Sequence, residues 1–310
     1  MVPVRFRWLL ALMILALVAG SGGVAPAGPA SVATAARTPV QAPAPSPSAS
    51  AAIIQFLDVG QGAAVLFHSG QTAILVDGGP PETGIVAKLR SAGVKHLNLV
   101  VATHAHADHI GGLVEALKAF PVGEVWYNGQ AFTTRAFERF VDAVDASGAR
   151  YREPTRGDSA TFGPFQVNVL NPARSAARSQ APIHENMLVV KVVFSDLSVL
   201  VTGDLEKTQE TEILNSPSGK ALAANLLQVG HHGSRNSSGQ SFLLAVHPRA
   251  AIYQAGVDNP YGHPHPETIA LLRQLKIPAW GTDQHGTISV FHDQSGYRIR
   301  GESGETLFIW

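Results

Sequence analysis

One seven-residue segment, THAHADH at residues 103–109, constrains this 310-residue chain more than any other feature. It places three histidines and one aspartate directly after an apolar segment, 97–102, that is typical of a buried strand. In an extended chain His104 and His106 project to the same side, while the last two ligands fall where the chain turns into a helix. Each histidine alone could be a surface or core residue, but this density of ligands predicts a metal centre that can hold two ions.

The composition limits which metals and partners are expected. The chain contains no cysteine, so neither disulfides nor thiolate ligands are available. Histidine and carboxylate ligands favour zinc, manganese or iron. The formal net charge is zero, with 23 Lys and Arg residues against 23 Asp and Glu residues, so no basic field attracts nucleic acid over long range. A bound polyanion would depend on the metals and on local groups such as Arg235.

The N-terminal part of the chain differs from the rest. Two arginines precede an apolar run, 8–19, that is too short to span a bilayer but suits the core of a signal peptide. Residues 1–27 are therefore predicted to be a signal peptide whose end could lie as late as residue 35, and an uncleaved anchor is the alternative. Residues 28–52, rich in Ala, Pro and Ser, predict a disordered linker. We expect 53–310 to form one domain that is secreted or tethered outside the cytoplasm.

Hydrophobic patterning in the remaining chain predicts alternating strands and helices of a layered α/β fold. Helices are expected at 84–92, 111–120, 132–146, 239–246 and 267–275. Strands are expected at 53–59, 63–68, 73–77, 97–102, 124–127, 188–194, 199–202, 225–229 and 250–253, with others near 160–170. Two final strands, 287–291 and 306–309, should finish the second of two sheets, and 171–182 predicts an irregular loop that could face the substrate.

Further candidate ligands follow other predicted strands. Asp204 comes directly after the strand at 199–202, where it could bind metal or cap the next helix. His231 follows the strand at 225–229 and is the expected metal ligand of the pair His231-His232. His232 should point elsewhere, because neighbouring side chains of an extended chain alternate.

Two aspartates end strands near the start of the domain. Asp58 could orient a ligand histidine from behind, or it could form an Asx turn at Gly60, and the family resemblance given below favours the first role. Asp77, in the segment Asp77-Gly-Gly-Pro, is predicted to form a structural turn near the site.

Six segments together resemble one family of hydrolases. They are FLDVGQGAAVLF (56–67), ILVDGG (74–79), THAHADHIGGL (103–113), LVTGDLE (200–206), VGHHGS (229–234) and NPYGHP (259–264). In this order they resemble the metallo-β-lactamase (MBL) domain of ComEC-type DNA-uptake proteins, over about residues 53–310. The resemblance implies the four-layer αββα MBL fold, an α/β fold in which two mixed sheets are sandwiched between helices.

The resemblance also implies a site with two divalent metal ions per chain, zinc or else manganese. The first ion would be held by His104, His106 and His184, the second by Asp108, His109 and His231, and Asp204 would bridge them. Relatives tend to carry Asn at about the position of His184, so Asn186 or a water is the alternative ligand. Candidates for catalysis are Asp108, His232 and His263, and the supporting candidates are Asp58, Asn186, Ser234 and Arg235.

Such a centre implies hydrolysis, since a hydroxide shared by two ions forms with a pKa near 7. The leading hypothesis is an exported phosphodiesterase or nuclease that acts on a small-molecule or nucleic-acid phosphodiester. One alternative is an MBL-fold hydrolase of lactams, lactones or other esters, and another is a non-catalytic, metal-stabilised surface binding module. No stable protein partner is implied, and membrane contact would come only through an uncleaved N-terminal segment.

Overall fold

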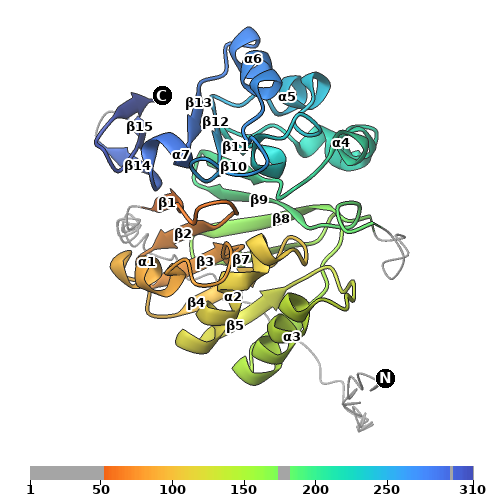
Figure 1. Ribbon diagram of the computed structural model, residues 1–310, viewed down its shortest axis with the longest axis vertical. Helices are drawn as coiled ribbons and strands as arrows, with labels where there is room; N and C mark the ends of the chain where they lie inside the picture. The colour runs from red at the N-terminus through yellow and green to blue at the C-terminus, as the bar shows by residue number, and fades with distance from the viewer. Residues whose placement is uncertain (1–51, 174–181, 294–295, 310) are drawn as a thin grey trace, which may run out of the picture. The chain divides into compact units, whose positions relative to one another are not determined.

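The computed structural model describes residues 52–173, 182–293 and 296–309 (Figure 1). The predicted signal peptide lies outside the described residues, and so does the predicted linker apart from Ala52. Most of the loop predicted at 171–182 also falls outside them. Among the described residues, no helix combines the length and apolar character needed to span a bilayer.

The first of two sheets joins strands from both ends of the domain. Among the described residues it contains nine strands in the order β16-β15-β14-β1-β2-β3-β4-β5-β6. The pairs from β3 to β6 are parallel and the others antiparallel, so the sheet is mixed. Its strands are β1 (Ile53–Phe56), β2 (Val65–Ser69), β3 (Thr72–Val76), β4 (Leu97–Val101), β5 (Val122–Trp126), β6 (Arg150–Arg152), β14 (Ile288–Asp293), β15 (Gly296–Arg300) and β16 (Thr306–Phe308).

The second sheet is built from the middle of the chain. Its seven strands in the described ranges have the order β13-β12-β11-β10-β9-β8-β7. The pairs from β10 to β13 are parallel and those from β7 to β10 antiparallel, so this sheet is mixed too. Its strands are β7 (Ser159–Phe162), β8 (Phe165–Asn171), β9 (Val189–Phe194), β10 (Leu197–Val201), β11 (Leu226–Gln228), β12 (Ala250–Tyr253) and β13 (Ala279–Gly281).

Helices cover the outer face of each sheet. The first sheet carries α1 (Ile85–Ser91), α2 (Ala107–Ala119) and α3 (Arg135–Ser147), and the second carries α4 (Lys207–Leu214), α5 (Gln240–Val246) and α6 (Pro266–Gln274). The two groups occupy opposite halves of the domain in Figure 1. Shorter helical turns are η1 (Pro217–Ala221), η2 (Gly230–Gly233) and α7 (Thr282–His285).

A third core lies between the two sheets and completes the layers. Phe67 of β2 and Phe165 of β8 meet there edge to face, with ring centroids 6.1 Å apart. Because successive side chains of a strand point to opposite faces, Val65 and Phe67 enter this core while Leu66 enters the core beneath the helices. Strands covered on both faces are expected to be largely apolar, as residues 65–67 of β2 and 73–76 of β3 are. The predicted four-layer αββα architecture is confirmed.

The placement of the last strands was predicted wrongly. β14 pairs antiparallel with β1, with Ile288 opposite Phe56, and β16 reaches the same sheet through β15. These strands therefore extend the first sheet, not the second. The pairing joins the two ends of the domain, and a contact at such separation leaves no signal in the local pattern of hydrophobic residues.

The helix after the THAHADH segment begins earlier than expected. We predicted its start at Gly111 from the apolar periodicity, but α2 starts at Ala107 with His106 as its N-cap. The first turn therefore contains Asp108 and His109 themselves. An aspartate in the first turn is favourable, because the N-terminal end of a helix carries partial positive charge.

Candidate metal centre

The predicted ligands lie in loops that leave the carboxyl ends of strands in both sheets. His104 and His106 follow β4, Asp204 follows β10, and the pair His231-His232 follows β11. In open α/β sheets, ligands bind outside the carboxyl ends of parallel strands. The four layers thus bring residues from distant parts of the sequence to one edge.

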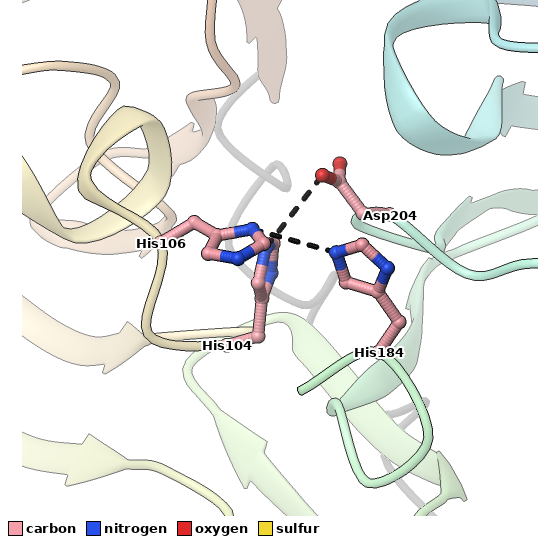
Figure 2. Close-up of side chains that lie close together, drawn as sticks. All are labelled: His104, His106, His184 and Asp204. Carbon is pink, nitrogen blue, oxygen red and sulfur yellow. Dashed lines mark hydrogen bonds and ion pairs between the residues drawn. The ribbon is translucent and has the colours of Figure 1, made fainter. Parts of the chain in front are cut away.

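A first cluster contains His104, His106, His184 and Asp204, whose ligand atoms all lie within 4.8 Å of one another. Figure 2 shows their rings and carboxylate pointing towards a common space. The Nδ1 atom of His106 lies 3.0 Å from His104 Nε2 and 3.4 Å from His184 Nε2. The structure therefore brings together the three histidines that were predicted for the first ion.

A second cluster contains Asp108, His109 and His232, again with ligand atoms within 4.8 Å of one another. His232 Nε2 lies 3.2 Å from Asp108 Oδ2. On its other side, His232 Nδ1 is 2.8 Å from the carbonyl oxygen of Gln254, to which it can donate. That contact keeps the proton on Nδ1 and leaves the Nε2 lone pair facing the cluster.

The histidine of this cluster is His232, whereas His231 was predicted. The prediction assumed an extended backbone, but both residues have left-handed φ angles, 50° and 55°, within η2. Side chains then no longer alternate as in a strand, and the second histidine of the pair turns towards Asp108. Non-glycine residues in this conformation cost of order 1 to 3 kcal/mol each and tend to occur at functional sites.

Asp204 lies between the two clusters with one oxygen towards each. Its Oδ2 is 3.6 Å from His104 Nε2 in the first cluster. Its Oδ1 is 3.1 Å from His109 Nε2 and 3.5 Å from His232 Nε2 in the second. This is the placement that a carboxylate bridging two ions needs, and Asp204 does not act as the side-chain cap of α4, whose N-cap is Glu206.

Buried polar atoms of the centre test whether metal ions fit. His109 Nε2, His232 Nε2 and Asp204 Oδ1 are buried without a hydrogen-bond partner among the described residues. Leaving one such atom unpaired costs about 1–3 kcal/mol. A cation that accepts lone pairs from all three removes that cost, and nitrogen with carboxylate oxygen is a donor set that zinc accepts. The residues present therefore fit divalent metal ions.

The pKa values of the buried groups at the centre also indicate a site that favours positive charge. Burial lowers the pKa of His104 well below its usual value, and the neighbouring His109 lowers it further. Burial alone would also lower the pKa of His109, but the carboxylates of Asp204 and Asp77 raise it well above its usual value. Burial opposes ionisation of Asp204, yet His109 and His232 hold its pKa well below the usual range. Positive charge is thus favoured between Asp77 and Asp204.

Asp77, not Asp58, is the carboxylate that contacts a candidate ligand histidine from behind. Asp77 is fully buried, and its Oδ2 lies 2.7 Å from His109 Nδ1. The same carboxylate accepts from the backbone N–H and the hydroxyl of Thr103, and that hydroxyl lies 3.1 Å from His104 Nδ1. Asp58 instead accepts from the backbone N–H of Gly60 at 3.0 Å, which is the Asx turn considered as its alternative role.

Close packing of glycines explains how Asp77 reaches His109. The Gly78 N–H donates to the carbonyl oxygen of His109 at 2.7 Å, and the Gly112 N–H donates to that of Gly79 at 2.9 Å. A Cβ atom on Gly112 would collide with the carbonyl oxygen of Gly78. The Asp77 loop can therefore lie directly on the start of α2 only because glycine occupies both sides of the contact.

His263 lies at the edge of the centre, beside the pair His231-His232. Its ring centroid is 5.6 Å from that of His231 and 6.1 Å from that of His232. Burial, together with His232 and His231, lowers the pKa of His263 to about 4. The ring is therefore neutral near pH 7, and it can donate or accept a hydrogen bond without carrying charge.

The remaining predicted residues make contacts of their own. Ser234 Oγ accepts from the backbone N–H of Asn236 at 3.3 Å. The exposed guanidinium of Arg235 donates to Glu267 at 2.8 Å. Asn186 is buried, and its backbone carbonyl oxygen accepts from Asn128 Nδ2 at 2.8 Å. In the loop that carries Asn186, it is His184 that lies in the first cluster.

Glu206 lies at the centre but was not among the residues predicted from the sequence. It forms a third group of possible ligands with His184 and His231, whose atoms lie within 4.8 Å of one another. The available signal was its position at the end of LVTGDLE, two residues after Asp204. A carboxylate at the start of α4 is also favourable for the helix itself, so the residue type at this position gave no separate indication of a role in the metal centre.

The chain is similar to a known protein family and to several known proteins. Residues 57–257 match the family described as the metallo-beta-lactamase superfamily. The matched range includes both ligand clusters and ends before His263.

Three curated relatives match the chain, among them a competence protein and a recombination protein, as their names state. The chain is 34% identical to ComE operon protein 3 of Bacillus subtilis (strain 168) over 67% of its length, 31% identical to competence protein ComA of Neisseria gonorrhoeae over 80%, and 30% identical to recombination protein 2 of Haemophilus influenzae over 80%. These matches confirm the predicted ComEC-type resemblance. The chain spans only 26%, 33% and 30% of these relatives, so it corresponds to about a third or less of each.

A solved structure with the same fold is CmlA, a diiron beta-hydroxylase from Streptomyces venezuelae. It aligns with a TM-score of 0.51 at 15% identity, over 76% of this chain and 53% of that chain. At this identity the likeness concerns the fold alone.

Proposed function

The chain belongs to the metallo-beta-lactamase superfamily, whose members are generally metal-dependent hydrolases, and on this premise we propose that it is a dinuclear phosphodiesterase or nuclease. The observation that carries the proposal is Asp204, which presents one carboxylate oxygen to each of two adjacent ligand clusters. Paired metal sites of this kind are used by phosphatases and nucleases to clamp both the attacking and the leaving oxygen.

The two clusters assign the ligands of the proposed ions. His104, His106 and His184 would hold the first, Asp108, His109 and His232 the second, and Asp204 would be shared. Zinc is the expected ion and manganese the alternative, since both accept nitrogen and carboxylate donors. Bound there, such ions would lower the pKa of a water and would stabilise charge on the attacked oxygen.

The protein's own side chains prepare this site. Asp77 holds the proton of His109 on Nδ1, and the carbonyl of Gln254 does the same for His232, so that Nε2 of each ring faces inwards. His263 is neutral at pH 7 and lies beside the cluster, where its ring N–H can donate to substrate oxygen.

Two features support a nucleic-acid phosphodiester as substrate. The curated relatives include a competence protein and a recombination protein. In addition, Tyr261 is 63% exposed beside the centre and stacks on His263, with ring centroids 5.7 Å apart and planes 24° from parallel. An exposed aromatic ring at this position can stack on a nucleobase next to the scissile phosphate. Arg235 contributes less than expected, because Glu267 pairs with it.

We also retain two proposals on chain organisation. The apolar run at 8–19 and the Ala- and Pro-rich residues after it support a signal peptide at 1–27 and a linker at 28–52. The domain at 53–310 would then act outside the cytoplasm, secreted or tethered to the cell surface.

A substrate panel tests the proposed function. The chain loaded with zinc or manganese is assayed against bis-p-nitrophenyl phosphate, single- and double-stranded DNA, a lactam and a lactone. We expect phosphodiester cleavage that is abolished by Asp204→Ala, since this change removes the ligand common to both clusters. Glu138→Ala, which removes an exposed carboxylate from α3, should leave activity unchanged.

Other outcomes would replace the proposal. Turnover of the lactam or lactone without phosphodiester cleavage would assign the ester and lactam alternative. Two bound ions per chain with no turnover of any substrate would assign a metal-stabilised binding module.

A further inference from the structure

Glu206 lies behind two histidines of the centre and has no part in the mechanism above. It is the N-cap residue of α4, and its backbone is extended, with φ −100° and ψ 163°. Its Oε1 atom is 3.2 Å from His184 Nδ1 and 3.6 Å from His231 Nδ1. One carboxylate oxygen therefore faces the same ring nitrogen of two histidines from different loops.

The opposite nitrogens of these two rings face the first cluster. His184 Nε2 is 3.4 Å from His106 Nδ1, and His231 Nε2 is 3.7 Å from Asp204 Oδ2. A neutral imidazole carries a single proton, so a hydrogen bond from Nδ1 to a carboxylate leaves the lone pair on Nε2. Contacts with Glu206 thus select the tautomer that points its lone pair inwards.

The carboxylate of Glu206 faces these two rings. The ammonium group of the next residue, Lys207, donates to the carbonyl oxygen of Arg235 at 2.6 Å. His231 Nδ1 is buried and has no aligned hydrogen bond among the described residues, so Glu206 Oε1 faces a donor that needs an acceptor. Hydrogen bonds to an ionised carboxylate are roughly twice as strong as neutral ones.

From these contacts we infer that Glu206 is a positioning residue of the metal centre. It accepts from Nδ1–H of His184 and places its carboxylate 3.6 Å from Nδ1 of His231, and it thereby makes His231 an additional Nε2 donor beside Asp204 in the first cluster. The inference rests on the metal sites of the proposed function but not on its substrate. The competing arrangement is a third ion held by Glu206 and the two Nδ1 atoms.

Metal titration of three variants of the full chain separates these arrangements. Glu206→Ala should retain two ions but weaken one of them about 10- to 100-fold, which is the usual effect of removing a partner behind a metal-binding histidine. Glu206→Gln keeps an oxygen acceptor without the charge, so it should recover part of the affinity. Glu212→Ala is the matched control, because it removes a carboxylate from the same helix, where Glu212 pairs with Arg156 on the surface.

Ring-nitrogen NMR of the metal-free chain gives a readout that a loss of stability would not imitate. In the wild type we expect the His184 and His231 signals to show Nδ1–H tautomers. In Glu206→Ala both should shift towards Nε2–H, while the signals of His232, whose Nδ1 contacts the Gln254 carbonyl, should stay unchanged.

Two results would overturn the inference. Binding of three ions by the wild type and two by Glu206→Ala, with unchanged affinity for those two, would make Glu206 a ligand. Equal affinities and equal tautomers in wild type and Glu206→Ala would remove any role in positioning. Neither result depends on hydrolysis, so a failure of the phosphodiester assignment would be seen separately in the substrate panel.

Discussion

Replacing Asp77 with asparagine should weaken metal binding while leaving the fold in place. Asp77 has a left-handed φ of 58°, and asparagine is among the residues that tolerate this region best. The substitution is also nearly isosteric. It therefore removes charge and one acceptor from the residue behind His109 without adding backbone strain or opening a cavity.

The magnitude follows from the three hydrogen bonds that Asp77 accepts. Its Oδ1 accepts from the Thr103 N–H at 2.8 Å, and its Oδ2 faces both the Thr103 hydroxyl and His109 Nδ1 at 2.7 Å. An amide has one oxygen for these two positions. With the oxygen at the Oδ1 position, the amide N–H faces His109 Nδ1, and the ring proton must move to Nε2, where it blocks ligation. This orientation costs the metal-free protein little.

Metal binding forces the opposite orientation of the amide. Its oxygen must then accept from His109, and its N–H₂ faces the buried N–H of Thr103, which leaves donors unpaired at a cost of about 1–3 kcal/mol. Because the cost arises only in the metal-bound state, it should reduce the affinity for zinc about 10- to 100-fold. The same range is typical when a partner behind a ligand histidine is mutated.

Calorimetric titration of the metal-free chain with zinc measures this loss directly. The matched control is Asp58→Asn, which alters the other aspartate near the end of a strand of the first sheet and should leave the isotherm unchanged. An unchanged isotherm for Asp77→Asn would refute the reasoning about the His109 tautomer. Weakening by Asp58→Asn instead would restore the role first predicted for Asp58.

The remaining predictions concern the second cluster, the substrate and the response to pH. His232→Ala should reduce the number of tightly bound ions from two to one by metal analysis, whereas His231→Ala should retain two; the reverse result would restore the predicted ligand. Tyr261→Ala should raise KM for single-stranded DNA about 5- to 100-fold through the loss of base stacking. Tyr261→Phe, which keeps the ring, should leave this KM unchanged, and Tyr261→Ala should not change KM for an abasic strand. Equal KM values for the wild type and both variants on single-stranded DNA would exclude stacking. Burial raises the pKa of Glu210 from 4.5 to about 7, although the backbone N–H groups of Gly239 and Ser238 oppose this. A pKa that is raised in the folded state contributes stability that is complete below pH 4.5 and is lost as the pH rises through 7. The free energy of unfolding is therefore measured for the wild type and for Glu210→Gln, both in the presence of chelator. The difference between the two proteins, wild type minus variant, should fall by about 3 kcal/mol between pH 4.5 and 7. A flat difference would contradict it.

The local sequence pattern was sufficient to predict several of the candidate ligands that the structure brings together. THAHADH places its four ligands by spacing alone, and Asp204 follows its strand directly. The choice between Asp58 and Asp77 was not accessible in this way, because both are aspartates near strand ends. Only the packing of Gly78 against Gly112 brings one of them to His109.

Backbone conformation explains the other differences. The pair His231-His232 was assigned by strand alternation, and two consecutive left-handed residues reverse that assignment. The pairing of β14 with β1 and the contact of Glu206 with two loops are both long-range, and neither has a signature in neighbouring residues.

The spread of the ligands from His104 to His232 determines when the centre can form during synthesis. The first sheet's loop supplies His104, His106, Asp108 and His109, but the shared carboxylate and the last histidine emerge only after β10 and β11 have been made. Ion binding would therefore be a late step that requires long-range contacts, which are slow to form. Once made, the centre ties a loop of one sheet to loops of the other. In a chain without cysteine, ions bound at this centre would be cross-links between the two sheets, and a chelator would remove these links while added metal would restore them.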